Sequence, residues 1–518
     1  MNGISINRRY FLAGAAAGAA AIAMRPGLSY AVEGDTLVIR GASDIEVLDP
    51  AFQNGLLEEE IGRCLFVSLN RLEDVREGVK WQPHAASELK QKSPTEIEFK
   101  LHDWLVWTGD FGPVTAEDVK YSFERVANPD NASAWAYAFD ALKEVEVTGE
   151  RSGVIHLKSP SAPFWVTTLP YYMGHIVCKK AVEAAGGKFT TEVPASAGPY
   201  LIDKWVPKQS LSLKLNPAWK GAPPAFPKVQ FQIITDDEAA ALAYESKAID
   251  YSKISLNTLA TYKDKVPEKT SLIQMDGNRL SWLAINVNNP KFAEEKVRRA
   301  IQYAIDVSQI MEGSYSGLAA SATGVVPPAM IGHREAILYP ADAAKAQALL
   351  DEAGVSGLTI ELAAQNDKTS QLTCQIIQAL LGAVGITVEI KSYDDGVYWT
   401  LGDKSSGDTW KTLELVLMNF AGGVDPSENL TWFRPSQIGV YNWSQFDSPE
   451  FETLYQEGMA ETDQEKRGAI YRKMQDLMEE SGGFVFITHE TFAAVARDGL
   501  KPCILADGYL DVTRFAKA

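Results

Sequence analysis

Residues 358–393 read LTIELAAQNDKTSQLTCQIIQALLGAVGITVEIKSY, and this stretch decides the fold class. Residues 358–365 and 386–393 are short apolar runs typical of strands, whereas 372–385 repeat their apolar side chains at helical spacing. A strand, a helix and a strand in this order form a βαβ unit with parallel strands and a right-handed crossover. The sequence therefore predicts an α/β fold.

Other elements flank this unit on both sides. An amphipathic helix is predicted over 293–306, a strand over 412–420, two helices within 447–483 and a closing strand over 484–490. The first half mixes strands with helices, beginning with a strand at 36–40. Together the two halves predict two α/β lobes.

Two helices are predicted in the first half of the chain. The stretch after residue 48 predicts a turn and then an apolar helix that reaches about Leu72. A second helix follows Thr115, with Asp118 three residues later completing a cap. Its apolar face is formed by Val119, Phe123 and Val126.

The N-terminus carries an export signal. Arg8 and Arg9 precede an apolar run from Tyr10 to Met24, which as a helix would reach about 22 Å, too short for the hydrocarbon core of a membrane. The basic start, the short apolar run and the small residues at its end predict a signal peptide over 1–31, cleaved after Ala31. The arginine pair followed by Tyr-Phe-Leu resembles a twin-arginine signal, so we expect the mature protein in a bacterial periplasm.

Charge and cysteine content limit the partners. The formal charge is −18, and loss of the three arginines in 1–31 would bring it to about −21, which repels nucleic acid and anionic lipid and favours a soluble monomer. The four cysteines are far apart in sequence, so disulfides are allowed but their pairing is left open. They are Cys64, Cys178, Cys374 and Cys503.

A family resemblance runs along almost the whole mature chain. It is carried by the order and spacing of several segments, none of them specific alone: LDP at 48–50, WQPHAASEL at 81–89, FKLHDWLVWTGDFGPVTAEDVKYSFERV at 99–126, GPYLIDKW at 198–205, VRRAIQYAID at 297–306 and GVDP at 423–426. In these the chain resembles the extracytoplasmic solute-binding proteins of ABC transporters, in the class that takes peptides, nickel chelates and opines.

The resemblance implies a two-lobed periplasmic binding protein fold with an inserted subdomain and an interlobe ligand cleft. We expect lobe I at 32–74, 195–290 and 490–518, the insertion at 75–194, and lobe II at 291–489. It also implies an ABC permease of the inner membrane as partner, a small-molecule solute as cargo and no enzymatic activity.

Two subclasses lose support at the GVDP segment. In peptide-binding relatives an aspartate three residues before the Asp-Pro pair holds the α-amine, and here Gly422 occupies that position. A buried ammonium needs a paired carboxylate, so the missing acid weakens a peptide cargo. Asp425 itself is more typical of a helix or turn cap.

The six histidines show no paired ligand spacing, so neither nickel nor any other cofactor is expected.

The remaining cargo class is a small organic solute that is peptide-like, opine-like or sugar-containing. Aromatic rings stack on sugar faces and amides match hydroxyl groups, so residues of both kinds near the predicted cleft are candidates. The candidate ligand-binding residues are Phe52, Gln53, Asn54, Trp282, Asn286, Asn288, Tyr393, Asn419, Phe420, Gly422, Trp432 and Tyr441.

Two other functions remain open. An exported hydrolase of a peptide or glycoside would need a catalytic group, but the chain contains no G-x-S-x-G and no H-E-x-x-H motif. A binding partner of a chemoreceptor would share the same site chemistry, so the sequence does not separate it from a transport protein.

Overall fold

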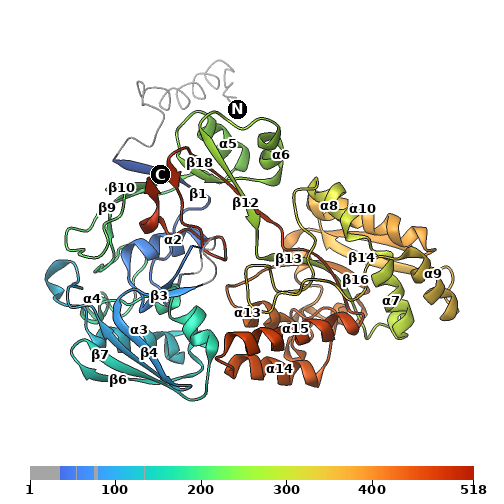
Figure 1. Cartoon of the computed structure of the whole chain (residues 1–518), viewed down its shortest axis with the longest axis horizontal. Helices are drawn as coiled ribbons and strands as arrows, with labels where there is room; N and C mark the ends of the chain where they lie inside the picture. Colours follow the sequence, from blue (N-terminus) through green and yellow to red (C-terminus); the bar gives the residue numbers. More distant parts are fainter. Residues whose placement is uncertain (1–34, 54, 75–79, 134, 518) are drawn as a thin grey trace, which may run out of the picture.

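The computed structural model describes residues 35–53, 55–74, 80–133 and 135–517. The predicted signal peptide and Asn54 therefore lie outside the described residues. Figure 1 shows two bodies side by side, one formed by the first half of the chain with its C-terminal end and the other by the second half. The predicted α/β fold with two lobes is confirmed.

Lobe I is built on a seven-stranded mixed sheet. Its central strand β1 pairs in parallel with β10 and β11, and the outer neighbours are antiparallel. The strand order is β12 (Thr270–Asp276), β18 (Thr491–Arg497), β11 (Tyr251–Lys253), β1 (Thr36–Gly41), β10 (Lys228–Ile233), β9 (Ser210–Leu215) and β8 (Tyr200–Val206). The helices of this lobe are α2 (Leu56–Leu65), α5 (Asp237–Glu245) and α6 (Leu256–Asp264).

A four-stranded antiparallel sheet lies in the predicted insertion. Its strands are, in spatial order, β4 (Ala86–Ser93), β5 (Glu96–Leu101), β7 (Ser152–Leu157) and β6 (Leu142–Gly149). Helices α3 (Ala116–Ala127) and α4 (Lys179–Ala184) accompany it, and a ribbon of β2 (Asn70–Leu72) and β3 (Trp81–Pro83) leads into it. The carboxylate of Asp118 accepts the backbone N–H of Thr115 at 2.9 Å, which confirms the predicted cap of α3.

Lobe II contains the predicted βαβ unit. Strands β14 (Thr359–Gln365) and β15 (Thr387–Tyr393) pair in parallel, with α10 (Lys368–Ala383) between them in sequence. Three further strands complete the five-stranded sheet, whose order is β15-β14-β16-β13-β17. They are β13 (Arg279–Ile285), β16 (Leu415–Ala421) and β17 (Phe484–Thr488).

Each face of the lobe II sheet has its own core. Leu283 and Ile285 of β13 pack with one set of helices, whereas Trp282 and Ala284 pack with the other, as the alternation of side chains along a strand requires. The first set is α7 (Glu295–Ala304), α8 (Val307–Tyr315), α9 (Ala343–Glu352) and α10. The second is α13 (Pro426–Leu430), α14 (Pro449–Ala460) and α15 (Gln464–Glu480).

The remaining short elements lie in both lobes. In lobe II they are α11 (Asp395–Tyr398) and α12 (Thr409–Thr412), and near the C-terminus they are β19 (Leu500–Lys501) and β20 (Ala516–Lys517).

The chain crosses between the lobes twice, and the two crossings lie side by side. It leaves lobe I between β12 and β13 and returns between β17 and β18, and the backbone N–H of Gly277 donates to the carbonyl of Glu490 at 2.9 Å where these two segments meet. A Cβ on Gly277 would lie 2.9 Å from that same oxygen, so the close approach requires glycine. Figure 1 shows β12 running toward β13 along this connection.

Strand β13 belongs to the lobe II sheet, although the expected boundary at residue 290 would assign it to lobe I. Its apolar sequence fits a buried strand in either sheet, and only its pairing with β16 and β17 decides the lobe. The chain returns to the lobe I sheet between Thr488 and Thr491. Helix α2 ends at Leu65 rather than near Leu72, because Val67 forms a bridge with Ile176 and β2 begins at Asn70.

Candidate functional site

The carboxyl ends of three strands of lobe II meet at one edge of its sheet. Gln365 ends β14 beside Tyr393 of β15, and the side-chain amide of Asn419 in β16 donates to Gln365 Oε1 at 3.1 Å. The guanidinium of Arg279, at the start of the antiparallel neighbour β13, donates to Asn419 Oδ1. Ligands of open α/β sheets lie beyond this edge, so it is the expected side for a site.

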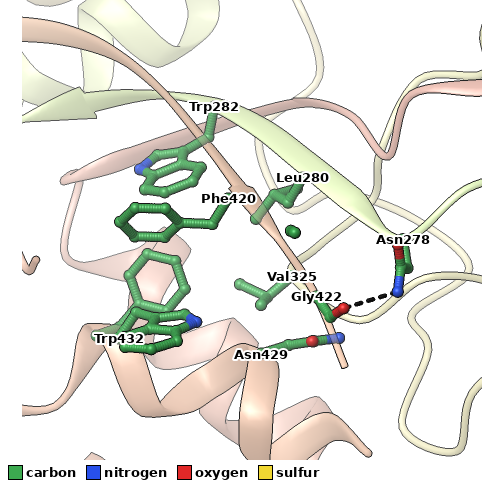
Figure 2. A pocket seen from close by; sticks show the side chains of 10 residues that line it. Asn278, Leu280, Trp282, Val325, Phe420, Gly422, Asn429 and Trp432 are labelled. Carbon is green, nitrogen blue, oxygen red and sulfur yellow. Dashed lines mark hydrogen bonds between the residues drawn. The ribbon is translucent and has the colours of Figure 1, made fainter. Parts of the chain in front are cut away.

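An aromatic cluster lies at the same edge. The ring of Phe420 is 5.1 Å from Trp282, 5.7 Å from Trp432 and 5.5 Å from Tyr441, measured between centroids. Trp282 is 1% exposed and belongs to the core, whereas Tyr441 is 39% exposed. Figure 2 shows Trp282, Phe420 and Trp432 on one side of a shallow pocket and Gly422 on the other. The pocket offers about 10 Å³, room for roughly one water molecule, so the rings largely fill it.

Gly422 is held against the connection between the lobes. Its N–H donates to the carbonyl of Asn278 at 2.9 Å, and the side-chain amide of Asn278 donates back to the Gly422 carbonyl at 2.7 Å (Figure 2). A Cβ at position 422 would lie 2.6 Å from the Asn278 carbonyl and 2.5 Å from Asn429 Oδ1. This close approach explains why the position carries no side chain and hence no acid.

A larger cavity lies between the lobes. Its volume is about 580 Å³, within the range of pockets that hold small molecules. The insertion contributes Tyr137, Asp140, Ser161, Thr168 and Met173, among others, and lobe II contributes Ser427, Glu428, Thr431, Arg434, Tyr455 and Met459, among others. The lining therefore offers hydroxyl groups, the carboxylates of Asp140 and Glu428, the guanidinium of Arg434 and apolar surface. It comes from two bodies that two segments of the described chain connect.

Glu428 is a carboxyl group of this cavity whose surroundings raise its pKa strongly. It lies in α13 and is partly exposed, and its Oε2 accepts the backbone N–H of Val424 at 3.2 Å. Burial among protein groups, and next the charge of Asp425, raise the pKa of Glu428 to about 8. Asp425 itself caps α13 through the N–H of Ser427 at 3.0 Å, which confirms its predicted structural role.

Lobe I and the insertion contain a group of interacting charged and polar side chains near α2. Glu59 and Arg63 of α2 form an ion pair at 2.5 Å, and Tyr171 donates a hydrogen bond to Asp507. Burial raises the pKa of Glu59 to about 8 and also raises that of Asp507. These residues were not among the predicted site residues, although three consecutive glutamates at 58–60 inside an apolar helix were a signal for them.

The structure brings together six of the twelve predicted residues at the sheet edge. They are Trp282, Tyr393, Asn419, Phe420, Gly422 and Trp432, and Tyr441 packs against two of them. Asn286 and Asn288 lie beyond the opposite end of β13, where Asn286 is 1% exposed and donates to Leu413 O at 2.8 Å, and Asn288 donates to Gln445 Oε1 at 3.2 Å. These contacts stabilise the turn after β13 and leave both residues away from the sheet edge.

The two predicted lobe I residues that the structure describes lie on the loop before α2. Phe52 is half-buried with Lys188 Nζ 4.2 Å from its ring centroid, and Gln53 is buried with its amide 3.4 Å from Glu59 Oε2. Four residues that line the cavity were not predicted from the sequence: Tyr137, Glu428, Arg434 and Tyr455. The place of Glu428 in the cavity could not be predicted from the sequence, because its side chain folds back from α13.

The described ranges contain neither a metal-binding cluster nor a disulfide. No group of three His, Cys, Asp or Glu side chains there is arranged to hold a metal ion. All four cysteines are buried, and none of them forms a disulfide within the described residues. Likewise, none of the helices described is both long and apolar enough to cross a bilayer.

Comparison with known proteins places this geometry among binding proteins. The model of the bacterial extracellular solute-binding proteins, family 5 Middle, matches residues 80–439. A dipeptide-binding protein of Escherichia coli is 26% identical over 82% of this chain and 79% of its own length. The structure of HbpA2 from Haemophilus parasuis superposes with a TM-score of 0.81 at 19% identity, covering 93% of this chain and 100% of the other. The open, unliganded form of the periplasmic murein tripeptide-binding protein MppA gives 0.80 at 21% identity, with 95% and 99% covered.

Proposed function

This chain belongs to the bacterial extracellular solute-binding proteins of family 5, and from that premise we propose that it is the periplasmic substrate-binding subunit of an ABC importer. It captures a small organic solute between its lobes and delivers it to an inner-membrane permease. As a solute-binding protein it is not an enzyme, so the hydrolase alternative is set aside.

One observation carries the transport role: a cavity of about 580 Å³ is lined by the insertion of lobe I on one side and by lobe II on the other, and two adjacent segments of the described chain join the lobes. A few backbone torsions at such a connection are enough to open and close the lobes. Solute contacts made only in the closed state would shift the population toward it, and release would reverse the shift.

The solute is peptide-like, with opine-like and sugar-containing compounds as the alternatives. The dipeptide-binding relative supports the first class. The exposed ring of Tyr441 beside Phe420 and Trp432, together with the amide of Asn419, supports the others, because rings and amides suit sugar faces and hydroxyl groups. We propose that the lobe II side of the site has two neighbouring parts. Residues 427–434 line the cavity itself, and the sheet edge beside them adds Tyr393, Asn419, Phe420, Gly422, Trp432 and Tyr441.

Location and domain limits complete the proposal. Residues 1–31 direct export and are removed after Ala31, leaving a periplasmic monomer. Lobe I comprises the sheet strands up to Asp276 and after Thr491, with the insertion at 75–194, and lobe II runs from Arg279 to Thr488.

The test is binding of solutes to ligand-free protein. Native mass spectrometry of the protein as purified would identify retained cargo, and a panel of peptides, opines and oligosaccharides would then be screened by thermal shift. At a ligand concentration 100 times Kd the expected stabilisation is about 2.7 kcal/mol. A panel that leaves the melting temperature unchanged throughout would contradict the proposed function.

A further inference from the structure

A second cavity, of about 570 Å³, lies where lobe I meets its insertion. This junction pocket is lined by the β2–β3 ribbon, the chain after β5, Pro199, residues 219–225 between β9 and β10, and residues 513–516 at β20. Figure 1 shows the C-terminal end of the chain next to β10, where two of these segments meet. The volume is that of a small-molecule site and is close to that of the cavity between the lobes.

The junction pocket is separate from the cavity between the lobes. The two share no lining residue among those described, and every described residue of the junction pocket belongs to lobe I or to the insertion. Movement of lobe II relative to lobe I should therefore leave the pocket unchanged.

Two tryptophans form one wall of the pocket. Trp104 and Trp219 meet edge to face with their ring centroids 4.9 Å apart, and His102 stacks on Trp104 at 5.3 Å. Trp219 Nε1 donates to the carbonyl of Ala222 at 3.0 Å. A Cβ on Gly221 would lie 2.5 Å from the Trp219 ring and 3.0 Å from the Trp104 ring, so glycine lets the loop pass close to both. The wall is thus a flat apolar surface held by its own loop.

The polar side chains of the pocket are cationic or neutral. Arg71, Lys220 and Arg514 line it, and among its described lining residues there is no aspartate or glutamate, although the whole chain has a formal charge of −18. Burial lowers the pKa of His84 to about 3, so this ring is neutral at pH 7. Its Nδ1 accepts the backbone N–H of Ser68 at 3.4 Å, which leaves the proton on Nε2 as a donor.

Two of the three cations lack a carboxylate partner. Arg514 takes the nearest acids, since its Nε lies 2.7 Å from Asp511 and its terminal nitrogen 3.0 Å from Glu73. The same acids attract Arg71 from a greater distance, but none of the described carboxylates forms an ion pair with it, and its buried Nε–H has no hydrogen-bond partner there. Lys220 is exposed and likewise forms no ion pair within the described chain.

We propose that the junction pocket is a second ligand site, which takes a small anion with a flat ring, such as an aryl carboxylate. Arg71 and Lys220 bind the carboxylate, because a charge-assisted hydrogen bond satisfies the buried guanidinium that the protein leaves unpaired. Trp104 and Trp219 pack against the ring, edge to face or offset. A cationic ligand would be repelled, and a neutral ring would leave Arg71 without a partner.

This ligand is distinct from the transported solute, so the inference goes beyond the proposed function. Because lobe I and the insertion build the whole pocket, its ligand should bind the open and the closed protein equally. A ligand with equal affinity for two states shifts neither population. Occupation of the junction pocket should therefore leave the affinity for cargo unchanged, while it stabilises the contact between the insertion and lobe I.

The experiment is isothermal titration of the full mature protein with 2-naphthoate at pH 7. Two matched compounds accompany it: 2-naphthamide, which keeps the rings but has no charge, and acetate, which keeps the charge but has no ring. We expect each to bind at least about 10-fold more weakly than 2-naphthoate. Affinity for 2-naphthoate should also fall as the salt concentration rises from about 50 to about 500 mM.

Four variants locate the site. Arg71→Met and Lys220→Met should each weaken 2-naphthoate binding about 10-fold or more. The matched controls are Arg434→Met, which removes the guanidinium of the cavity between the lobes, and Lys466→Met, at an exposed position of α15; both should bind as the parent does. A melting curve of each variant establishes that it is folded. Because Lys220 is exposed, its variant tests the charge even if Arg71→Met does not fold.

Several results would overturn the inference. These are no binding of 2-naphthoate, equal affinity for 2-naphthamide, or unchanged binding by the folded Lys220→Met and Arg71→Met proteins. Loss of binding in Arg434→Met alone would place the anion between the lobes instead. None of these results would contradict the transport role, which depends on cargo, and a panel of solutes that fails to find cargo would leave this site untouched.

Discussion

Asn278 and Gly422 exchange two hydrogen bonds across the base of the connection between the lobes. The Gly422 N–H donates to the Asn278 carbonyl at 2.9 Å, and the Asn278 side-chain amide donates to the Gly422 carbonyl at 2.7 Å. Asn278 lies between the two sheets, directly before β13, and Gly422 begins the loop that leads to Glu428. The position of the candidate site is thus tied to the segment that must move when the lobes close.

Replacement of Asn278 by Ala should loosen this tie. Loss of the side-chain hydrogen bond should lower the free energy of unfolding by about 1 kcal/mol and weaken solute binding, since the Gly422 loop loses its support. Chemical denaturation and titration calorimetry measure the two effects. Asn257→Ala, at an exposed position, serves as the control and should change neither quantity.

Glu428→Gln should stabilise the free protein at alkaline pH. The folded pKa of about 8 lies above the usual value of 4.5, so the folded state binds more protons between these limits and its stability falls as the pH rises through them. The amide cannot ionise, so the variant should lose this part of the slope and unfold at a higher temperature at pH 9. Equal pH profiles for the two proteins would show that Glu428 is not perturbed.

Arg467→Met should be strongly destabilising. Arg467 and Asp425 form a bidentate pair in which both side chains are buried, and Arg467 Nε also donates to the Gly458 carbonyl at 2.7 Å. Removal of the cation leaves an uncompensated buried carboxylate, at an expected cost of about 3–5 kcal/mol in urea unfolding. The double variant with Asp425→Asn should recover part of that loss; an additive result would argue against the pair.

Two aromatic substitutions should separate core from site. Trp282→Ala removes a fully buried ring and should cost about 3–5 kcal/mol of unfolding free energy. Tyr441→Ala removes a ring that is 39% exposed, so it should affect stability little and solute affinity more. A Tyr441→Ala protein that binds the identified cargo as tightly as the parent would exclude that ring from the site.

The four cysteines should behave as inert thiols. All are buried and none forms a disulfide within the described residues, and burial raises the pKa of Cys374 to about 12, which leaves almost no reactive thiolate of Cys374 at neutral pH. A reductant should therefore leave the melting temperature unchanged, and iodoacetamide should label the chain only after urea is added. Labelling of the native protein at several cysteines would contradict the observed packing.

Much of the fold followed from local sequence, because periodicity and caps act within one element. The βαβ unit and the cap of α3 are examples. The lobe of β13 and the end of α2 were not predictable, since each depends on a partner that is distant in sequence: β16 and β17 for the first, and Ile176 for the second.

The site was only partly predictable for the same reason. Asn419, Phe420 and Gly422 follow a recognisable strand, so their place at a sheet edge could be inferred. Asn286 and Asn288 are amides of the same kind, but their side chains already donate to Leu413 O and Gln445 Oε1, and Asn286 Oδ1 accepts the backbone N–H of Asn288. Glu428 reaches the loop only because glycine at 423 leaves space for its carboxylate, which is a relation in space and not in sequence.

The late arrival of β18 has a consequence for biosynthesis. This strand lies inside the lobe I sheet, between β12 and β11, yet it is encoded after the whole of lobe II. A nascent chain can therefore assemble lobe II, whose strands all come from one continuous stretch, before lobe I can close its sheet. A premature stop codon shortly after residue 488 would leave the first-made half of the molecule as the unfinished one, with the edges of β11 and β12 open to aggregation.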